Sequence, residues 1–174
     1  AATEVYVAGM ASLRSRREAV VREHMEAENR HDFDAVIATF AHPRYELIAT
    51  GQVHDGEDEV RGYFASSRGA FPDQRNELVA MHSTEDGVWV EFDLLGTHDG
   101  AFLGFDPTGR TFRCRMAAFF VFDDERIVVE RVDPAYTSLG QRIEVPVGST
   151  VDYGADLMAV HDPAAFGQLV EAAK

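Results

Sequence analysis

Two long strand-like runs joined by a glycine-rich segment constrain the fold of this chain more than any other feature. Residues 88–95 and 111–122 are rich in apolar side chains, and the segment 96–109 between them carries four glycines and a Pro-Thr-Gly turn. A crossing of this length predicts a connection at the edge of a sheet. Turn chemistry alone would explain the glycines. Because His98 stands beside apolar side chains there, the segment could also form the mouth of a cavity.

Helical periodicity dominates the first part of the chain. Residues from Leu13 to about Arg30 place apolar side chains and His24 on one stripe, where a histidine is more often a core residue than a catalytic one. Asp32 is a suitable N-cap for a second helix, and Asp55-Gly56 for a third. Strands are expected at residues 45–50, 75–82, 88–95, 111–122 and 126–133.

Helices followed by a meander of strands indicate an α+β domain. We expect the helices to pack on one face of a curved antiparallel sheet, because alternation in residues 88–95 gives one apolar face and one mixed face. A curved sheet closed by helices at one end leaves a conical pocket at the other.

Composition excludes several function classes. The 174 residues suffice for one domain, and the formal net charge of −14 disfavours nucleic acid and anionic membranes as partners. The single cysteine, Cys114, lies in an apolar run and is expected to be buried. The chain shows neither a membrane-spanning run nor a signal-peptide pattern, so the sequence predicts a cytoplasmic protein.

Three motifs together resemble a known family. Residues 96–110, GTHDGAFLGFDPTGR, are similar to the GTHxGxFxGxxPTGR signature of the SnoaL-like polyketide (ester) cyclases, which have a cone-shaped fold like that of nuclear transport factor two. Residues 29–35 resemble the family's NxxDxDA helix junction, and residues 70–73 its AFPD motif. The matches imply a domain over residues 16–141, an N-terminal arm over 1–15, and a C-terminal extension over 142–174 that covers the pocket or a dimer seam.

The resemblance implies a reaction and a missing residue. Enzymes of this family close rings by intramolecular aldol condensation on a polyketide ester without a metal or organic cofactor, using an aspartate as base. The position of that aspartate is Ala135 in this chain, and alanine exchanges no proton. Asp133, two residues earlier, is therefore the candidate base in a shifted position. It could equally be a solvated turn residue, which suits its neighbour Pro134. If the family's aspartate position aligned one residue later, Tyr136 would occupy it and could act as a proton donor.

Other candidate site residues follow from the matched motifs and the apolar strands. His98 could assist proton transfer or only bond the loop backbone, and Arg131 could pair with Asp133 and weaken it as a base. Candidate substrate-binding side chains, each also a plausible core residue, are Tyr45, Phe64, Trp89, Phe92, Met116, Phe120 and Arg131.

Three functions remain open at this point. The first is a cofactor-free cyclase or isomerase, formally a lyase or isomerase, acting on a hydrophobic polyketide-like substrate through Asp133. The second is a non-catalytic binding protein in which Ala135 marks lost chemistry. The third is a changed reaction, such as epoxide opening or hydration, that uses Glu46, Glu91 or Asp93.

No cofactor is expected, and no metal, because His31, His42, His54, His82 and His161 lack the spacing of metal ligands. The family resemblance also implies a homodimer.

Overall fold

A computed structural model of the chain describes residues 12–48, 50–102, 105–133, 142–144 and 150–152, with Asp133 and the last two ranges as backbone only. Most of the expected arm (1–15) and of the expected extension (142–174) lies outside the described residues.

The described residues form three α-helices, α1 (Leu13–Asn29), α2 (Phe33–Ala38) and α3 (Glu57–Ala70). The side chains of Ser12 and Asp32 cap α1 and α2 by accepting backbone N–H groups, as expected for Asp32. None of the helices in the described part is long and apolar enough to cross a bilayer.

The main sheet has six strands in the order β2-β1-β6-β5-β4-β3. Their bounds are β1 Arg44–Leu47, β2 Gln52–Asp55, β3 Arg75–Ser83, β4 Gly87–Thr97, β5 Thr111–Asp123 and β6 Arg126–Asp133. Strands β7 (Arg142–Glu144) and β8 (Thr150–Asp152) form a separate antiparallel pair.

The sheet is mixed, which corrects the expectation of an antiparallel sheet. β3, β4, β5 and β6 form the expected antiparallel meander, but β1 pairs with β6 in parallel, with Glu46 opposite Arg131. The turn after β5 brings β6 alongside β1, a strand from a much earlier part of the chain. Alternation within a single strand does not encode such a long-range pairing.

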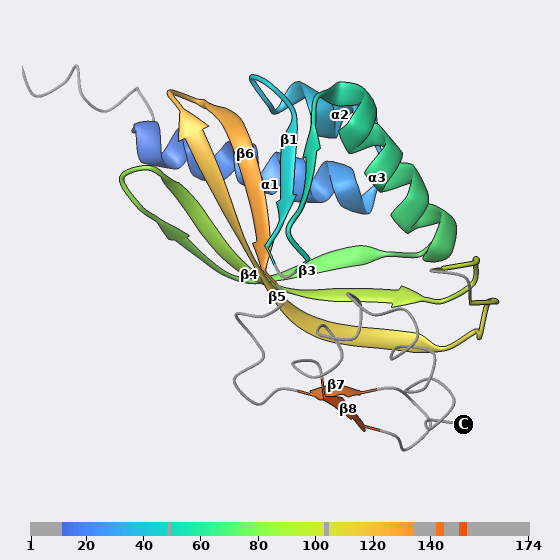
Figure 1. Cartoon of the computed structure of the whole chain (residues 1–174). Coiled ribbons are helices and arrows are strands. Elements are labelled where there is room, and N and C mark those ends of the chain that lie inside the picture. The colour runs from blue at the N-terminus through green and yellow to red at the C-terminus, as the bar shows by residue number, and fades with distance from the viewer. Residues whose placement is uncertain (1–11, 49, 103–104, 134–141, 145–149, 153–174) are drawn as a thin grey trace, which may run out of the picture.

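The helices cover one face of the curved sheet, and the core lies between these two layers (Figure 1). Val88, Val90 and Phe92 of β4 join that core, whereas Trp89 is 37% exposed on the opposite face and stacks on Phe119. The alternation predicted for this strand is therefore confirmed.

The glycine-rich segment is fastened to the end of α3. The backbone N–H groups of Asp99 and Gly100 donate to the carbonyl oxygen of Ala70, and those of Thr108 and Gly109 donate to that of His98. Gly100 approaches α3 so closely that an added Cβ would overlap the carbonyl oxygen of Gly69. The glycine at this position is thus required by a close backbone approach.

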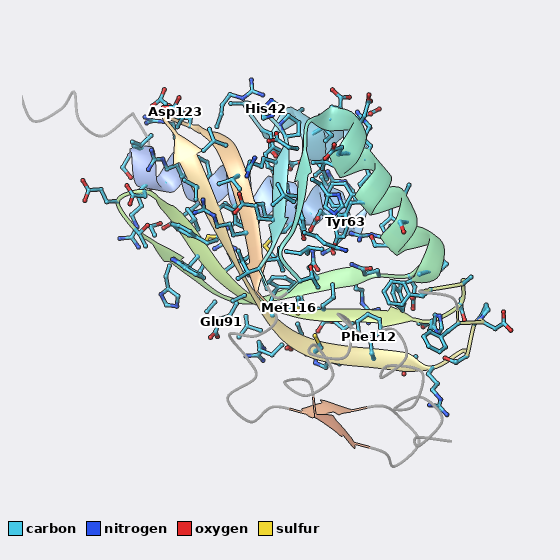
Figure 2. The ribbon with its side chains drawn as sticks, in the orientation of Figure 1. His42, Tyr63, Glu91, Phe112, Met116 and Asp123 are labelled. Carbon is cyan, nitrogen blue, oxygen red and sulfur yellow. The ribbon has the colours of Figure 1, made fainter. Side chains whose placement is uncertain are left out.

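An ion-pair cluster holds β4 and β5 together on the face away from the helices, where Glu91 also lies (Figure 2). The carboxylate of Asp93 accepts hydrogen bonds from Arg113 and Arg115, each with a shortest distance of 2.6 Å. Arg113 and Arg115 lie two residues apart on β5, so they share one strand face and meet the same carboxylate.

Replacing Asp93 by asparagine should destabilise the fold in a pH-dependent way. The hydrogen bond from Arg115, together with that from Arg113, holds the pKa of the Asp93 carboxyl below its usual range. A lowered folded-state pKa stabilises the protein above the unfolded pKa of about 3.9, and that stability is lost as the pH falls through the folded pKa. Urea denaturation near pH 7 should show a loss of about 1–3 kcal/mol in Asp93→Asn, and the difference should shrink in acid. Glu91→Gln, which alters a more exposed carboxylate nearby, should change little; equal losses in both variants would contradict this account.

Replacing Gly100 by alanine should loosen the attachment of the loop to α3. The methyl group has no room beside Gly69, so the loop must shift and lose its hydrogen bonds to Ala70. We expect thermal unfolding to show a loss of about 1–3 kcal/mol. Gly62→Ala is the matched control, because Gly62 lies within α3 with open space around it and should gain about 0.5–1 kcal/mol. A stable Gly100→Ala protein would disprove the close approach.

Candidate active site

A small cavity lies between the helices and the sheet, with a volume of about 40 Å³. Helices α1 and α3 form one wall and strands β1, β3, β4, β5 and β6 the other. Its lining combines aromatic rings with charged and amide groups, namely Glu28, Tyr45, Tyr63, Phe64, Arg68, Gln74, Asn76, Phe92, Leu94, Met116 and Glu130. Mixed linings of this kind are typical of ligand sites.

Glu28 brings a carboxyl group to the cavity from the last turn of α1. The side chain is only 5% exposed, and its Oε2 accepts a hydrogen bond of 2.6 Å from Nδ2 of Asn76 on β3. Burial raises the pKa of Glu28, and the nearby charge of Glu130 raises it further, while the Asn76 hydrogen bond opposes the shift. The two carboxyls therefore resist ionising together.

Glu130 brings the second carboxyl from β6, a strand inside the sheet. It is 3% exposed, and burial raises the pKa of Glu130 to about 8, although the charge of Arg68 pulls it down. The guanidinium of Arg68 lies over the rings of Phe33 and Phe64, at 5.6 and 5.7 Å from their centroids. The charge of Arg68 therefore acts on both Glu28 and Glu130.

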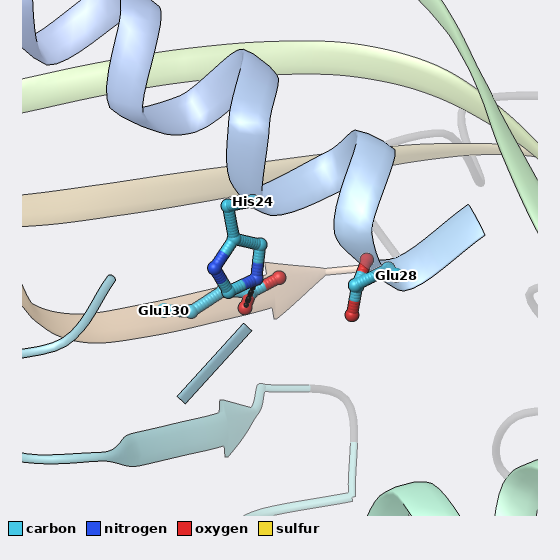
Figure 3. Close-up of side chains that lie close together, drawn as sticks. All are labelled: His24, Glu28 and Glu130. Carbon is cyan, nitrogen blue, oxygen red and sulfur yellow. Dashed lines mark ion pairs between the residues drawn. The ribbon is translucent and has the colours of Figure 1, made fainter. Parts of the chain in front are cut away.

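His24 touches the same cluster from one turn earlier on α1 (Figure 3). Its Nδ1 lies 2.8 Å from Oγ1 of Thr39, and that hydroxyl donates its proton to the carbonyl oxygen of Val36 at 2.6 Å. Oγ1 of Thr39 must therefore accept from Nδ1–H. In this hydrogen-bond assignment Nε2 carries the lone pair, and it faces Oε2 of Glu130 at 3.1 Å. Burial lowers the pKa of His24, which favours the neutral ring.

Two tyrosines complete the polar part of the cavity. Tyr63 projects from α3 toward the sheet (Figure 2) and stacks on Tyr45 of β1, with ring centroids 4.8 Å apart. Burial raises the pKa of Tyr63 to about 12 and that of Tyr45 well above its usual value. Both phenols therefore stay protonated at neutral pH and are available as donors.

The predicted pocket residues divide into two groups. Four of them line this cavity, namely Tyr45, Phe64, Phe92 and Met116. Trp89 lies on the other face of the sheet, and Phe120 is buried in the core against the His24 ring. Arg131 is paired with Glu46 at 2.8 Å and does not line this cavity. Alternation along β4 turns Trp89 outward, packing beneath α1 buries Phe120, and the ion pair with Glu46 holds Arg131.

Of the predicted catalytic residues, the structure describes the side chain of His98 alone. His98 follows β4, accepts or donates a hydrogen bond with Thr108, and packs near Phe71 rather than at this cavity. The side chain of Asp133, and all of Ala135 and Tyr136, lie outside the described residues.

The three carboxylates considered for a changed reaction do not line the cavity either. Asp93 is bound by arginines, Glu91 lies on the same outer face, and Glu46 pairs with Arg44 and Arg131.

Neither Glu28 nor Glu130 was predicted from the sequence, although the position of each indicates a buried side chain. Glu28 follows His24 by one helical turn, so it shares the face that turns toward the sheet. Glu130 shares its strand face with Val132, which is buried. A charged residue on an apolar face is the mark of a buried polar group that needs partners.

Comparison with solved structures finds the same fold in several proteins. IdmH, a candidate polyketide cyclase from Streptomyces antibioticus, is 25% identical, with 67% of this chain and 89% of that chain covered and a TM-score of 0.59. AclR, a candidate hydroxylase from Streptomyces galilaeus, is 22% identical, with coverages of 68% and 78% and a TM-score of 0.60. A hypothetical protein with a ketosteroid isomerase-like fold from Catenulispora acidiphila, solved with trimethylamine, is 21% identical, with coverages of 65% and 82% and a TM-score of 0.56.

Comparison with curated proteins finds no significant match. The family model of the SnoaL-like domain matches residues 21–130, more than half of the chain. The matched region contains every residue that lines the cavity. This agreement bears out the resemblance of the three sequence motifs, and the chain belongs to the SnoaL-like domain family.

Proposed function

We propose that the protein is an enzyme that transfers protons on a hydrophobic, carbonyl-containing small molecule of the polyketide type, by the enolate chemistry of cyclases and isomerases. One observation carries this proposal: two buried carboxyls, Glu28 and Glu130, and two tyrosines, Tyr45 and Tyr63, border the same cavity. The family supports it, and so does the similarity to IdmH, a candidate polyketide cyclase.

The arrangement suggests a role for each group. Glu28 acts as the base, because it borders the cavity and the hydrogen bond from Asn76 favours its ionised form. Removing a proton next to a carbonyl leaves negative charge on the carbonyl oxygen, which a neutral hydroxyl donor stabilises. Tyr45 and Tyr63 supply such donors. Glu130, whose pKa burial raises to about 8, can return a proton to the product.

The size of the cavity limits the part of the substrate that it receives. Pockets that enclose drug-sized molecules usually measure about 300–1,000 Å³, whereas this one is about 40 Å³. We therefore expect it to hold the reacting carbonyl and its neighbouring carbons. The aromatic rings of Phe64 and Phe92 suit a hydrophobic chain at that position.

Two alternatives keep specific support in the sequence. Asp133 remains the candidate displaced base, two residues before the position where the family places its aspartate. Ala135 at that position also favours a binding protein without catalysis. The experiment that tests the proposal must therefore separate three outcomes: Glu28 as base, Asp133 as base, and no proton transfer at all.

Enolisation should be detectable without knowledge of the natural substrate. In deuterated water the protein should exchange the α-protons of β-keto esters, followed by NMR over a series of chain lengths. Glu28→Gln keeps the shape and the hydrogen-bonding capacity of the side chain but removes the base, so exchange should fall by about 10²–10⁴-fold. Asp133→Asn is the matched variant and should retain exchange.

The opposite pattern, with loss in Asp133→Asn and retention in Glu28→Gln, would assign the base to the strand end. Saturable binding by calorimetry, without exchange in any of the three proteins, would favour a binding protein without catalysis. Circular dichroism of each variant verifies that a lost rate does not reflect a lost fold.

Removing a donor hydroxyl should lower turnover more than binding. Tyr63→Phe keeps the ring stacked on Tyr45 but deletes one hydroxyl, so kcat should fall by about 10²–10³-fold with little change in KM. The control is Tyr136→Phe, which removes the alternative donor named in the sequence analysis. A larger loss in Tyr136→Phe than in Tyr63→Phe would contradict the role given to the stacked pair.

A further inference from the structure

Two buried acceptor atoms face each other inside this cluster. Nε2 of His24 and Oε2 of Glu130 lie 3.1 Å apart, and neither has a hydrogen-bond partner among the residues that the structure describes. Because Thr39 fixes the proton of the imidazole on Nδ1, Nε2 presents a lone pair to a carboxyl oxygen. Two lone pairs at this distance repel each other unless a cation lies between them. That cation is either a proton or a metal ion.

The spacing of the two atoms suits a metal ion. With metal–ligand bonds of about 2.1 Å, two neighbouring ligands are roughly 3.0 Å apart at the right angles of octahedral coordination and roughly 3.4 Å apart at a tetrahedral angle. The observed 3.1 Å lies within this range. One carboxylate oxygen of Glu28 completes a group of three ligand atoms within 4.8 Å of one another. The side chains of His24 and Glu28 project from α1 and that of Glu130 from β6 toward one point (Figure 3). A modest swing of Glu28 would bring its oxygen into bonding range.

The surroundings of the three ligands also fit. Metal-binding histidines usually donate their other N–H to a neighbouring acceptor, which fixes the ring; here Thr39 accepts it. Asn76 holds the Glu28 carboxylate in the same way. Arg68 can balance one of the two carboxylates, so one negative charge remains when both are ionised. Glu28 and Glu130 line the cavity, which leaves room for water or a substrate oxygen at the remaining positions.

We propose that His24, Glu28 and Glu130 bind a divalent transition-metal ion at the inner end of the cavity. One imidazole and two carboxylates suit zinc, manganese or ferrous ions. On binding, the proton shared between Glu130 and His24 leaves for solvent, and the metal takes its place between Nε2 and Oε2. The sequence analysis expected no metal because it examined the spacing of other histidines and treated His24 as a core residue.

This inference concerns the same two carboxyls as the proposed function, because a bound metal would take the place of their protons, but it is tested by binding rather than by turnover. The protein, treated with a chelator and desalted, is titrated with zinc by calorimetry and with cobalt by visible absorption. We expect one site per chain and a cobalt spectrum with nitrogen and oxygen ligands. Glu130→Gln, which keeps the side-chain shape, should weaken binding at least tenfold, and Thr39→Val should weaken it by about 10–100-fold.

His42→Gln is the matched control, because His42 forms an exposed pair with Asp55, at 2.6 Å, that could collect metal adventitiously. Binding should survive this change. The proposal is overturned if zinc does not bind, if binding survives in Glu130→Gln, or if it is lost in His42→Gln. Anomalous scattering from a zinc-soaked crystal of the unaltered protein gives a check that needs no variant, since the peak must lie between His24 and Glu130.

Discussion

The contact between His24 and Glu130 is the interaction on which the interior of this protein depends. A histidine and a carboxyl group, each less than one-tenth exposed, meet beneath α1 with a second carboxyl, Glu28, beside them. Removing such groups from water costs several kcal/mol each unless partners replace the lost hydration. Thr39 and Asn76 supply part of that replacement, and a cation between Nε2 and Oε2 supplies the rest. The packing of α1 on the sheet is therefore tied to the protonation or metal state of this cluster.

The topology of the sheet makes the cluster possible. Parallel pairing with β1 on one side and antiparallel pairing with β5 on the other keep β6 inside the sheet, so Glu130 is covered from both edges. The same pairing sets Tyr45 opposite Glu130, on the adjacent strand. On the outer face, Asp93 and its two arginines hold β4 to β5 without using any group of the cavity. The ion-pair cluster and the cavity thus lie on opposite faces of the sheet.

Local patterns in the sequence predicted the elements well and their pairing less well. β6 was expected at residues 126–133 and is found there, and the inward face of β4 was read from its alternation. The short strand β2 and the parallel β1–β6 pair were missed, because both depend on contacts between distant segments. The same limit applies to the site. Phe64 and Phe92 were recognised as possible lining residues since apolar side chains usually turn inward, whereas Glu28 and Glu130 were missed because a glutamate is usually solvated.

The buried cluster bears on the question that the family's missing aspartate raises. A protein that only bound an apolar molecule would be more stable with apolar side chains in place of His24, Glu28 and Glu130, since well-packed hydrophobic residues often match or exceed a buried ionic group in stability. Two buried carboxyls that line one cavity, with a buried histidine beside them, are therefore a cost that binding alone does not explain. In this chain the cone presents carboxyls from α1 and β6, at Glu28 and Glu130. Membership of the family fixes the cone-shaped fold, whereas the side chains inside the cone determine the reaction.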